Sequence, residues 1–182
     1  VVTCGSQQAL DLVTRVFCDP GDVVLAEAPS YVGALGTFRA YQCEIVHVAM
    51  DEHGLEPEAL RNALVTLKAA GKRVKFLYTI PNFHNPAGVT QTLERRHAII
   101  QIAQEHGLLI IEDNPYGLLT LEAEPMPALR SMDADNVVYL RALCLLCRDG
   151  TRASFTRRTD GCSDVIDIGA ADKYVAVCRL HL

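Results

Sequence analysis

Short apolar runs alternate with longer amphipathic stretches over the first 140 residues, and this alternation restricts the fold more than any other feature of the chain. The runs are bounded by Asp, Gly, Pro or Asn and are apolar almost throughout. Strands that are buried on both faces of a parallel sheet have this character. The strands expected from these runs are residues 23–26, 44–48, 74–80, 108–111 and 137–140.

The stretches between the runs have helical periodicity. In the third of them, Ile99 and Ile102 recur at helical spacing while charged residues occupy the opposite face. Pro57 suits the first turn of a helix, and Gly71 and Gly107 stand where helices commonly end. Strands that alternate with helices predict a doubly wound α/β fold, with a mostly parallel sheet flanked by helices and ligands at the carboxyl ends of its strands. The expected helices are residues 7–17, 57–70 and 93–106.

The overall composition excludes several classes of function. The net charge of -5 provides no basic surface for nucleic acid in this segment. No apolar run reaches the roughly 18 residues of a membrane span, and Val1 opens into patterned sequence without a signal peptide or an initiator Met. Seven cysteines in no tight framework fit reduced thiols. We therefore expect a cytoplasmic globular protein whose sequence continues upstream.

The composition changes near residue 140. All 8 prolines and every glutamate precede this point, whereas four of the seven cysteines follow it. Residues 1–140 contain 10 Lys and Arg against 17 Asp and Glu, a net of -7, and residues 141–182 contain 7 against 5, a net of +2. The two values sum to the -5 of the whole chain. We therefore expect one domain over 1–140 and a different segment over 141–182.

Two candidate ligand-binding fragments lie in the first 31 residues. Gly5, Ser6 and Gln7 open the first helix, where unsatisfied N–H groups can hold a phosphate. Tyr31 follows the strand 23–26 at its carboxyl end, where an aromatic side chain can stack on a flat ring. Each fragment alone also fits an ordinary role, Ser6 as a helix cap and Tyr31 as a half-buried loop residue.

Two further fragments follow later strands. Residues 81–88, with Pro-Asn-Phe-His-Asn-Pro-Ala-Gly, can form a stiff loop that presents the Asn85 amide, and the Asn85–Pro86 bond is a candidate for a cis peptide. Asp113 ends an apolar strand, where its carboxylate needs a partner, and Tyr116 follows three residues later. A plain turn and an Asp cap are the alternatives for these fragments.

Together, the four fragments resemble the class I and II aminotransferases, which depend on pyridoxal 5'-phosphate (PLP), in order and approximate spacing. Residues 3–12, Thr-Cys-Gly-Ser-Gln-Gln-Ala-Leu-Asp-Leu, are most similar to 2-aminoadipate-type aminotransferases and to the aminotransferase-like domains of GntR/MocR-type regulators. The resemblance covers residues 1–140 and implies an incomplete large domain of a fold-type I PLP-dependent transferase. In the intact family this domain belongs to a homodimer.

The resemblance also implies a role for each site residue. The PLP phosphate would contact Gly5, Ser6 and Gln7, and Tyr31 would stack on the pyridine ring. Asn85 and Tyr116 would hydrogen-bond the phenolic oxygen of the cofactor. Asp113 would pair with the protonated pyridine nitrogen and so keep the ring an electron sink.

The lysine that forms the Schiff base in this family is missing from its expected place. It should follow the strand 137–140 in a Ser-x-x-Lys or similar stretch, but residues 141–148 contain no lysine, and Lys173 is too far down the tail. A frameshift, mis-joined exon or truncated gene model explains this best. An inactive relative is a second explanation, and an added module is a third. For such a module, Cys144-x-x-Cys147 and Cys178-x-x-His181 have zinc-ligand spacing within each pair, although we expect no metal.

We therefore expect a fragment of a PLP-dependent aminotransferase, which moves an amino group from an amino acid to a 2-oxo acid but is inactive by itself. The alternative is the effector-sensing domain of a GntR-type transcription regulator, which an upstream winged-helix domain would indicate. A third possibility is a fold relative that catalyses β-elimination.

Overall fold

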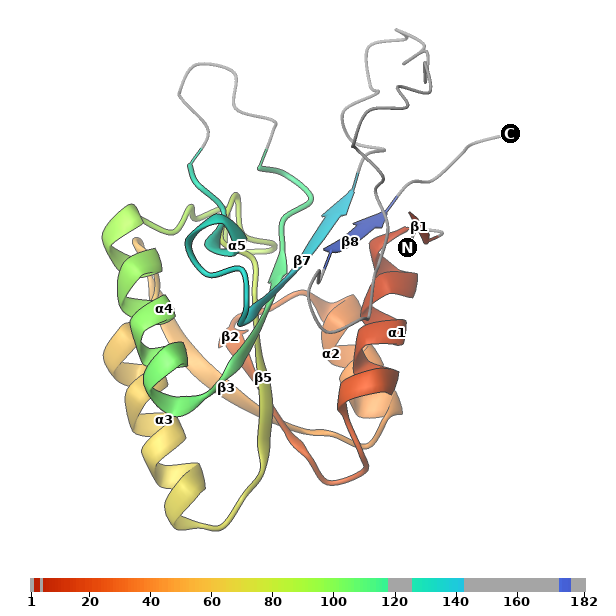
Figure 1. Ribbon diagram of the computed structural model, residues 1–182, viewed down its shortest axis with the longest axis vertical. Coiled ribbons are helices and arrows are strands. Elements are labelled where there is room, and N and C mark those ends of the chain that lie inside the picture. Colours follow the sequence, from red (N-terminus) through yellow and green to blue (C-terminus); the bar gives the residue numbers. More distant parts are fainter. Residues whose placement is uncertain (1, 4, 118–125, 143–173, 178–182) are drawn as a thin grey trace, which may run out of the picture.

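The computed structural model describes residues 2–3, 5–117, 126–142 and 174–177 (Figure 1). Strands and helices alternate along most of this part of the chain. The elements are β1 (Val2–Thr3), α1 (Ser6–Phe17), β2 (Val23–Ala28), α2 (Val32–Ala40), β3 (Glu44–Asp51), β4 (Gly54–Leu55), α3 (Pro57–Ala69), β5 (Val74–Thr79), α4 (Leu93–His106), β6 (Leu109–Asp113), α5 (Leu129–Met132), β7 (Val137–Ala142) and β8 (Tyr174–Val177).

The strands form one sheet in the order β1-β8-β7-β6-β5-β2-β3-β4. Every pairing among the described strands is parallel except the short antiparallel pair of β3 and β4. The chain moves from β2 outward to β3, and then crosses back to β5 on the other side of β2. This reversal makes the space between β2 and β5 the topological switch point, where ligands of open α/β sheets bind.

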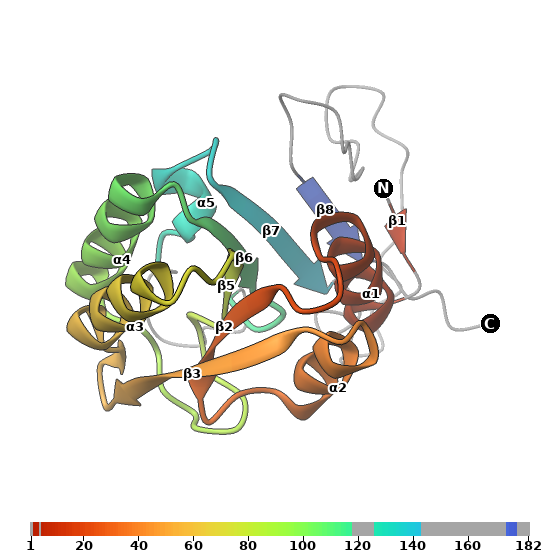
Figure 2. The same ribbon diagram turned by 90° about the horizontal axis from the view of Figure 1, so that it is seen from below.

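Helices cover both faces of the sheet, as Figure 2 shows from below. On one face α1 and α2 pack against alternate strand residues such as Val24 and Ala26. On the other face α3, α4 and α5 pack against the intervening residues, such as Val23 and Leu25. Because successive side chains of a strand point to opposite faces, each central strand contributes to both cores and is apolar almost throughout.

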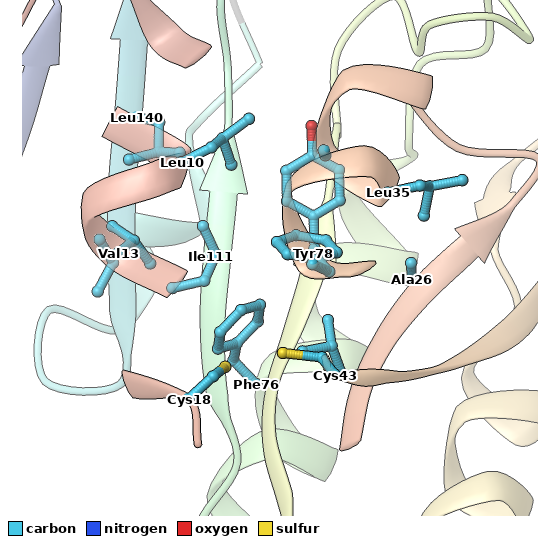
Figure 3. Packing of buried hydrophobic residues seen from close by; sticks show 14 of the residues in the cluster. Leu10, Val13, Cys18, Ala26, Leu35, Cys43, Phe76, Tyr78, Ile111 and Leu140 are labelled. Atoms are coloured by element: carbon cyan, nitrogen blue, oxygen red, sulfur yellow. The ribbon is translucent and has the colours of Figure 1, made fainter. Parts of the chain in front are cut away.

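The core under α1 and α2 contains an aromatic group at its centre (Figure 3). The ring of Phe38 from α2 packs edge-on against Phe76 and Tyr78 of β5, with centroid distances of 5.6 and 5.5 Å. Edge-to-face geometry of this kind is favoured between aromatic rings. The Tyr78 hydroxyl points in the direction of the carboxyl ends of the strands (Figure 3). Its apolar body is therefore fixed in the core while its polar end approaches the edge where ligands bind.

Local signals in the sequence explain where the longer helices begin and end. In α3, Pro57 occupies the first turn and Lys68 the last. In α4, the Thr92 side chain accepts a hydrogen bond from the Arg95 N–H at 3.4 Å, and Gly107 ends the helix in the left-handed conformation with φ 61°. Within the described ranges, no helix is long and apolar enough to cross a membrane.

The predicted fold class is confirmed, as are the five predicted strands and three predicted helices, with ends shifted by a few residues. The sequence reasoning missed α2, which runs through Gly33 and Gly36 and has no charged residue before Arg39. Two glycines and the lack of a polar face remove the usual helical pattern. The short elements β1, β4, α5 and β8 were also not predicted.

Candidate functional site

Three loops meet at the carboxyl ends of adjacent parallel strands. They follow β2, β5 and β6, which are neighbours in the sheet order. The loop after β2 carries Tyr31, the loop after β5 carries Asn85, and β6 ends at Asp113, with Tyr116 shortly after it. The topology thus brings four of the seven predicted site residues to the carboxyl ends of three neighbouring strands, although they span residues 31–116 of the sequence.

Asp113 is the most deeply buried of these groups, with a relative exposure of 3%. Its Oδ2 atom accepts a hydrogen bond from the Tyr78 hydroxyl at 2.7 Å, whereas its Oδ1 atom is buried and has no hydrogen-bond partner. Burial raises the pKa of Asp113 to about 6, and the Tyr78 hydrogen bond opposes this rise. A buried carboxylate oxygen without a partner is costly, so this atom is suited to a positively charged or N–H-bearing ligand.

Glu112, the preceding residue, has a structural role instead. Its carboxylate accepts the backbone N–H groups of Leu129 at 3.2 Å and Arg130 at 2.9 Å, which open α5. Burial raises the pKa of Glu112 to about 7 despite these hydrogen bonds. Alternation along β6 therefore sends one carboxylate to the α5 side and the next toward Tyr78.

The loop after β5 is anchored to β2 through a buried pair. Nε2 of His84 lies 3.0 Å from Oε2 of Glu27, and both side chains are 1% exposed. Glu27 also accepts hydrogen bonds from the Thr79 hydroxyl at 2.8 Å and the Ile80 N–H at 2.9 Å. The Ala87 N–H points to His84 Nδ1 at 3.3 Å. Glu27 thus fixes the end of β5 through two hydrogen bonds and lies against His84 of the loop that carries Asn85. The His84 Nε2 atom makes no hydrogen bond within the described part of the chain.

Asn85 and Tyr116 line the same cavity of about 420 Å³. A volume of this size lies in the usual range for small-molecule sites. The Asn85–Pro86 peptide bond is cis, as the sequence suggested. The other residues that line this cavity are Phe83, His84, Pro86 and Gly88.

A buried arginine ties the loops at this edge together. Arg96 of α4 is fully buried and donates to the backbone oxygens of Pro81 at 2.9 Å and Pro127 at 2.8 Å, and to Asn82 Oδ1 at 2.8 Å. Asn82 in turn donates to Asn114 Oδ1 at 2.9 Å. Because five N–H groups project from one rigid plane, a single guanidinium can hold several loop segments at fixed separations.

The first turn of α1 is held against α2. Gly5 precedes the helix with φ 90°, and Ser6 is its first residue. The Gln7 amide donates to Thr37 Oγ1 at 2.6 Å and to the Gly33 oxygen at 3.2 Å. The Tyr31 ring lies so close to Gly33 that a β-carbon there would be 2.5 Å from it. These contacts connect the N-terminus of α1, through the start of α2, to Tyr31.

Four residues with roles in this arrangement were not identified from the sequence. They are Glu27, His84, Tyr78 and Arg96. Glu27 could have been found, because a charged residue inside an apolar strand is unusual. Tyr78 and Arg96 have no unusual sequence context, and only their tertiary contacts show their roles.

The lysines of the described part of the chain lie away from this edge. Lys75, at the start of β5, is 3.3 Å from Asp22, and Lys72 pairs with Glu44 at 2.6 Å. Lys68 lies in the last turn of α3, which leads into β5. All three are near the amino ends of the strands. Lys173 and the pairs Cys144–Cys147 and Cys178–His181 fall outside the described residues.

The fold and the site define a class of protein: an α/β domain with a buried acidic group, a small cavity and a helix N-terminus along one edge of its sheet. The family model for aminotransferase class I and II matches residues 1–144. The aromatic-amino-acid aminotransferase 1 of Thermococcus litoralis is 42% identical over 153 residues, which cover 84% of this chain and 37% of the relative. The 2-aminoadipate transaminase of Thermus thermophilus is 38% identical over 159 residues, covering 85% and 39%.

A solved structure agrees with these sequence matches. The kynurenine aminotransferase of Pyrococcus horikoshii, crystallised with pyridoxamine phosphate (PMP), kynurenine and kynurenic acid, superposes with a TM-score of 0.72 at 42% identity. The match covers 75% of this chain and 34% of that one. The chain belongs to the class I and II aminotransferase family. It spans 37% and 39% of the length of the two curated relatives named above.

A second family model, that of thymidine kinase, matches residues 125–182 and overlaps the first over 125–144. This overlap includes residue 140, where the composition of the chain changes. The similarity to thymidine kinase covers under a third of the chain and concerns mainly the segment beyond the described part of β7.

Proposed function

We propose that residues 1–140 form the PLP-binding part of an aminotransferase that moves an amino group from an amino acid to a 2-oxo acid. The observation that carries this proposal is the buried Asp113 Oδ1 atom, which has no hydrogen-bond partner. A protonated pyridine nitrogen would supply both the missing hydrogen bond and the missing positive charge.

The other residues fit the remaining parts of the cofactor. The start of α1, which no described side chain caps, and the Ser6 hydroxyl are suited to its phosphate. Tyr31, the N-cap residue of α2, would cover the ring, and Gln7 connects the starts of α1 and α2. Asn85 and Tyr116 share a cavity whose polar side chains suit the phenolic oxygen.

The bound cofactor supplies an electron sink for a carbanion at the substrate's α-carbon. The residues of this chain would hold and tune it. Asp113 would keep the ring nitrogen protonated, and the Glu27–His84 pair and Arg96 would keep the loops in place. Such preorganised electrostatics contribute strongly to catalysis because no reorganisation is needed when charge develops.

We propose that this chain by itself does not complete the reaction. Transamination needs a lysine that binds the cofactor covalently and moves the proton, and the only lysine after Lys75 is Lys173. The three lysines in the described ranges lie at the opposite edge of the sheet. The relatives named above are enzymes, so the comparisons give no support to the regulator alternative.

Binding of PMP tests the cofactor proposal, because PMP needs no lysine anchor. We expect the full chain to bind PMP in calorimetry and Asp113→Asn to bind it at least about tenfold more weakly, since one charge-assisted hydrogen bond is lost. Asp11→Asn is the matched control, since Asp11 accepts from Tyr41 away from the site at 3.0 Å. Equal affinity in the chain and in Asp113→Asn would contradict the proposal.

We also propose that the chain departs from an aminotransferase sequence within residues 141–182, after the part that the relatives match, since their alignments cover 84–85% of the chain. The change in composition at residue 140 and the similarity of 125–182 to thymidine kinase support this. Sequencing the transcript across the codons for residues 125–150 tests it. A shift of reading frame or a join within this region is expected, and a Ser-x-x-Lys stretch in another frame would identify a frameshift. An uninterrupted transcript encoding the same residues would favour an added module.

A further inference from the structure

Tyr78 forms the single hydrogen bond that Asp113 accepts from a side chain in the described part of the chain. The hydroxyl lies 2.7 Å from Asp113 Oδ2, and neither residue is more than 3% exposed. The ring cannot easily move away, because Phe38 packs edge-on against it at 5.5 Å and its side chain is fully buried. The position of the Tyr78 oxygen is therefore set by the core and not by the ligand.

The hydroxyl also keeps its proton. Burial, and then the nearby charge of Asp113, raise the pKa of Tyr78 well above its usual value. Tyr78 therefore favours its protonated form, in which the hydroxyl donates to Asp113. An ionised carboxylate has only acceptor sites, so Oδ2 is satisfied by Tyr78 and Oδ1 is the oxygen that remains for a ligand.

We propose that Tyr78 is a positioning residue of the cofactor site, which occupies one oxygen of Asp113 and thereby directs the other, as an ionised carboxylate, to the pyridine nitrogen. This inference rests on the proposed function. It assigns to a core tyrosine of β5 a role exerted through Asp113 and not through contact with the cofactor.

The surroundings of Asp113 make this role necessary. From β2, Glu27 places a second negative charge near Tyr78, and Tyr31 from the following loop adds a phenol. From β7, Tyr139 lies close enough for Asp113 to affect its pKa. Glu112 precedes Asp113 on β6 but is engaged by the backbone of α5. None of these described groups brings a positive charge to Asp113, so the Tyr78 hydrogen bond is what opposes protonation by burial.

The test compares PMP with its carbocyclic analogue, in which C–H replaces the ring nitrogen. Calorimetry at pH 7.5 on the full chain is expected to show PMP bound more tightly than the analogue. In Tyr78→Phe we expect PMP affinity to fall by up to about fourfold at this pH, since that is the loss of ionised Asp113 for a midpoint raised by one to two units, while affinity for the analogue is unchanged. Tyr41→Phe is the matched control, because it removes another Tyr–Asp hydrogen bond, that to Asp11 at 3.0 Å, and should change neither affinity.

A second measurement does not need the cofactor. The carboxyl ¹³C resonance of Asp113, assigned by its loss in Asp113→Asn, is expected to titrate near pH 6 in the chain. In Tyr78→Phe the titration midpoint of Asp113 should rise by about one to two pH units. This is the shift expected when the charged form of a group loses one hydrogen bond. The PMP affinity of Tyr78→Phe should then recover, relative to the chain, as the pH is raised through this new midpoint.

The outcomes separate the two proposals. Equal weakening of PMP and the analogue in Tyr78→Phe would mean that Tyr78 is merely structural and would overturn the inference. An unchanged midpoint for Asp113 would also overturn it, even if the chain selects PMP. If the unaltered chain binds PMP and the analogue equally, the cofactor role of Asp113 fails, and the inference fails with it.

Discussion

Asp113 shows how a single residue can be unfavourable for folding and suited to binding. Its carboxyl is almost completely buried, one oxygen has no partner, and its pKa is raised from 3.8 to about 6. Between these two pH values the unfolded chain releases a proton that the folded chain retains. The contribution of Asp113 to the free energy of unfolding is therefore largest below about pH 4. It falls as the pH rises toward 6 and stays low above that pH.

Replacing Asp113 with Asn should consequently stabilise the cofactor-free chain more at pH 8 than at pH 4. A shift from 3.8 to about 6 corresponds to an upper limit on the order of 3 kcal/mol, at about 1.4 kcal/mol per unit. Urea unfolding at the two pH values measures the difference. Asp11→Asn controls for the loss of one negative charge, and a gain that is equal at both pH values would show that Asp113 is ionised without cost.

At the scale of single elements, two glycines in helices have opposite conformational roles. Gly36 lies within α2, and Gly107 ends α4 with φ 61°. An added β-carbon would meet nothing within 4 Å at either position, so only the backbone distinguishes them. Alanine is favoured in a helix interior, whereas the left-handed conformation is unfavourable for any residue with a β-carbon.

We therefore expect Gly36→Ala to raise the free energy of unfolding by about 0.5–1 kcal/mol and Gly107→Ala to lower it by about 1 kcal/mol. Each variant is the control for the other, because both add a methyl group to an open position. Chemical denaturation resolves changes of this size. Destabilisation by Gly36→Ala would show that α2 needs its glycine for a reason other than helix formation.

The same elements show how far local patterns extend. Thr92, Pro57 and Gly107 mark helix ends that the sequence predicted to within a few residues, because caps and first-turn prolines act locally. Helix α2 lacked such marks and was missed. It forms because Ala34, Leu35 and Phe38 are buried against β2 and β5, and this packing outweighs the cost of two glycines.

At the scale of the whole molecule, the chain corresponds to only part of an aminotransferase. It spans less than two fifths of the two curated relatives named above, and its match to the aminotransferase family model ends at residue 144. We expect the full chain, supplied with PLP, an aromatic amino acid and a 2-oxo acid, to form no 2-oxo product above background. Chromatographic detection of the product measures this.

Borohydride reduction followed by peptide mapping provides the complementary measurement. If a lysine of this chain carried the cofactor productively, reduction would leave a stable adduct on a defined peptide and abolish turnover. Turnover together with an adduct at Lys173 would overturn the proposed inactivity. Scattered adducts on Lys68, Lys72 or Lys75 without turnover would agree with it, since these lysines lie near the amino ends of the strands.

The sequence alone determined the α/β architecture, the strands and several site candidates, because burial on two faces and helix periodicity leave direct patterns in the order of residues. Tertiary structure decided which distant side chains meet. Tyr78 and Asp113 are 35 positions apart and are joined because β5 and β6 are parallel neighbours. Arg96 binds two loops, the one after β5 and the one before α5, and Glu27 contacts His84 because β2 and β5 are neighbours in the sheet. Such contacts depend on strand order and on pairing across the sheet, which no local pattern specifies.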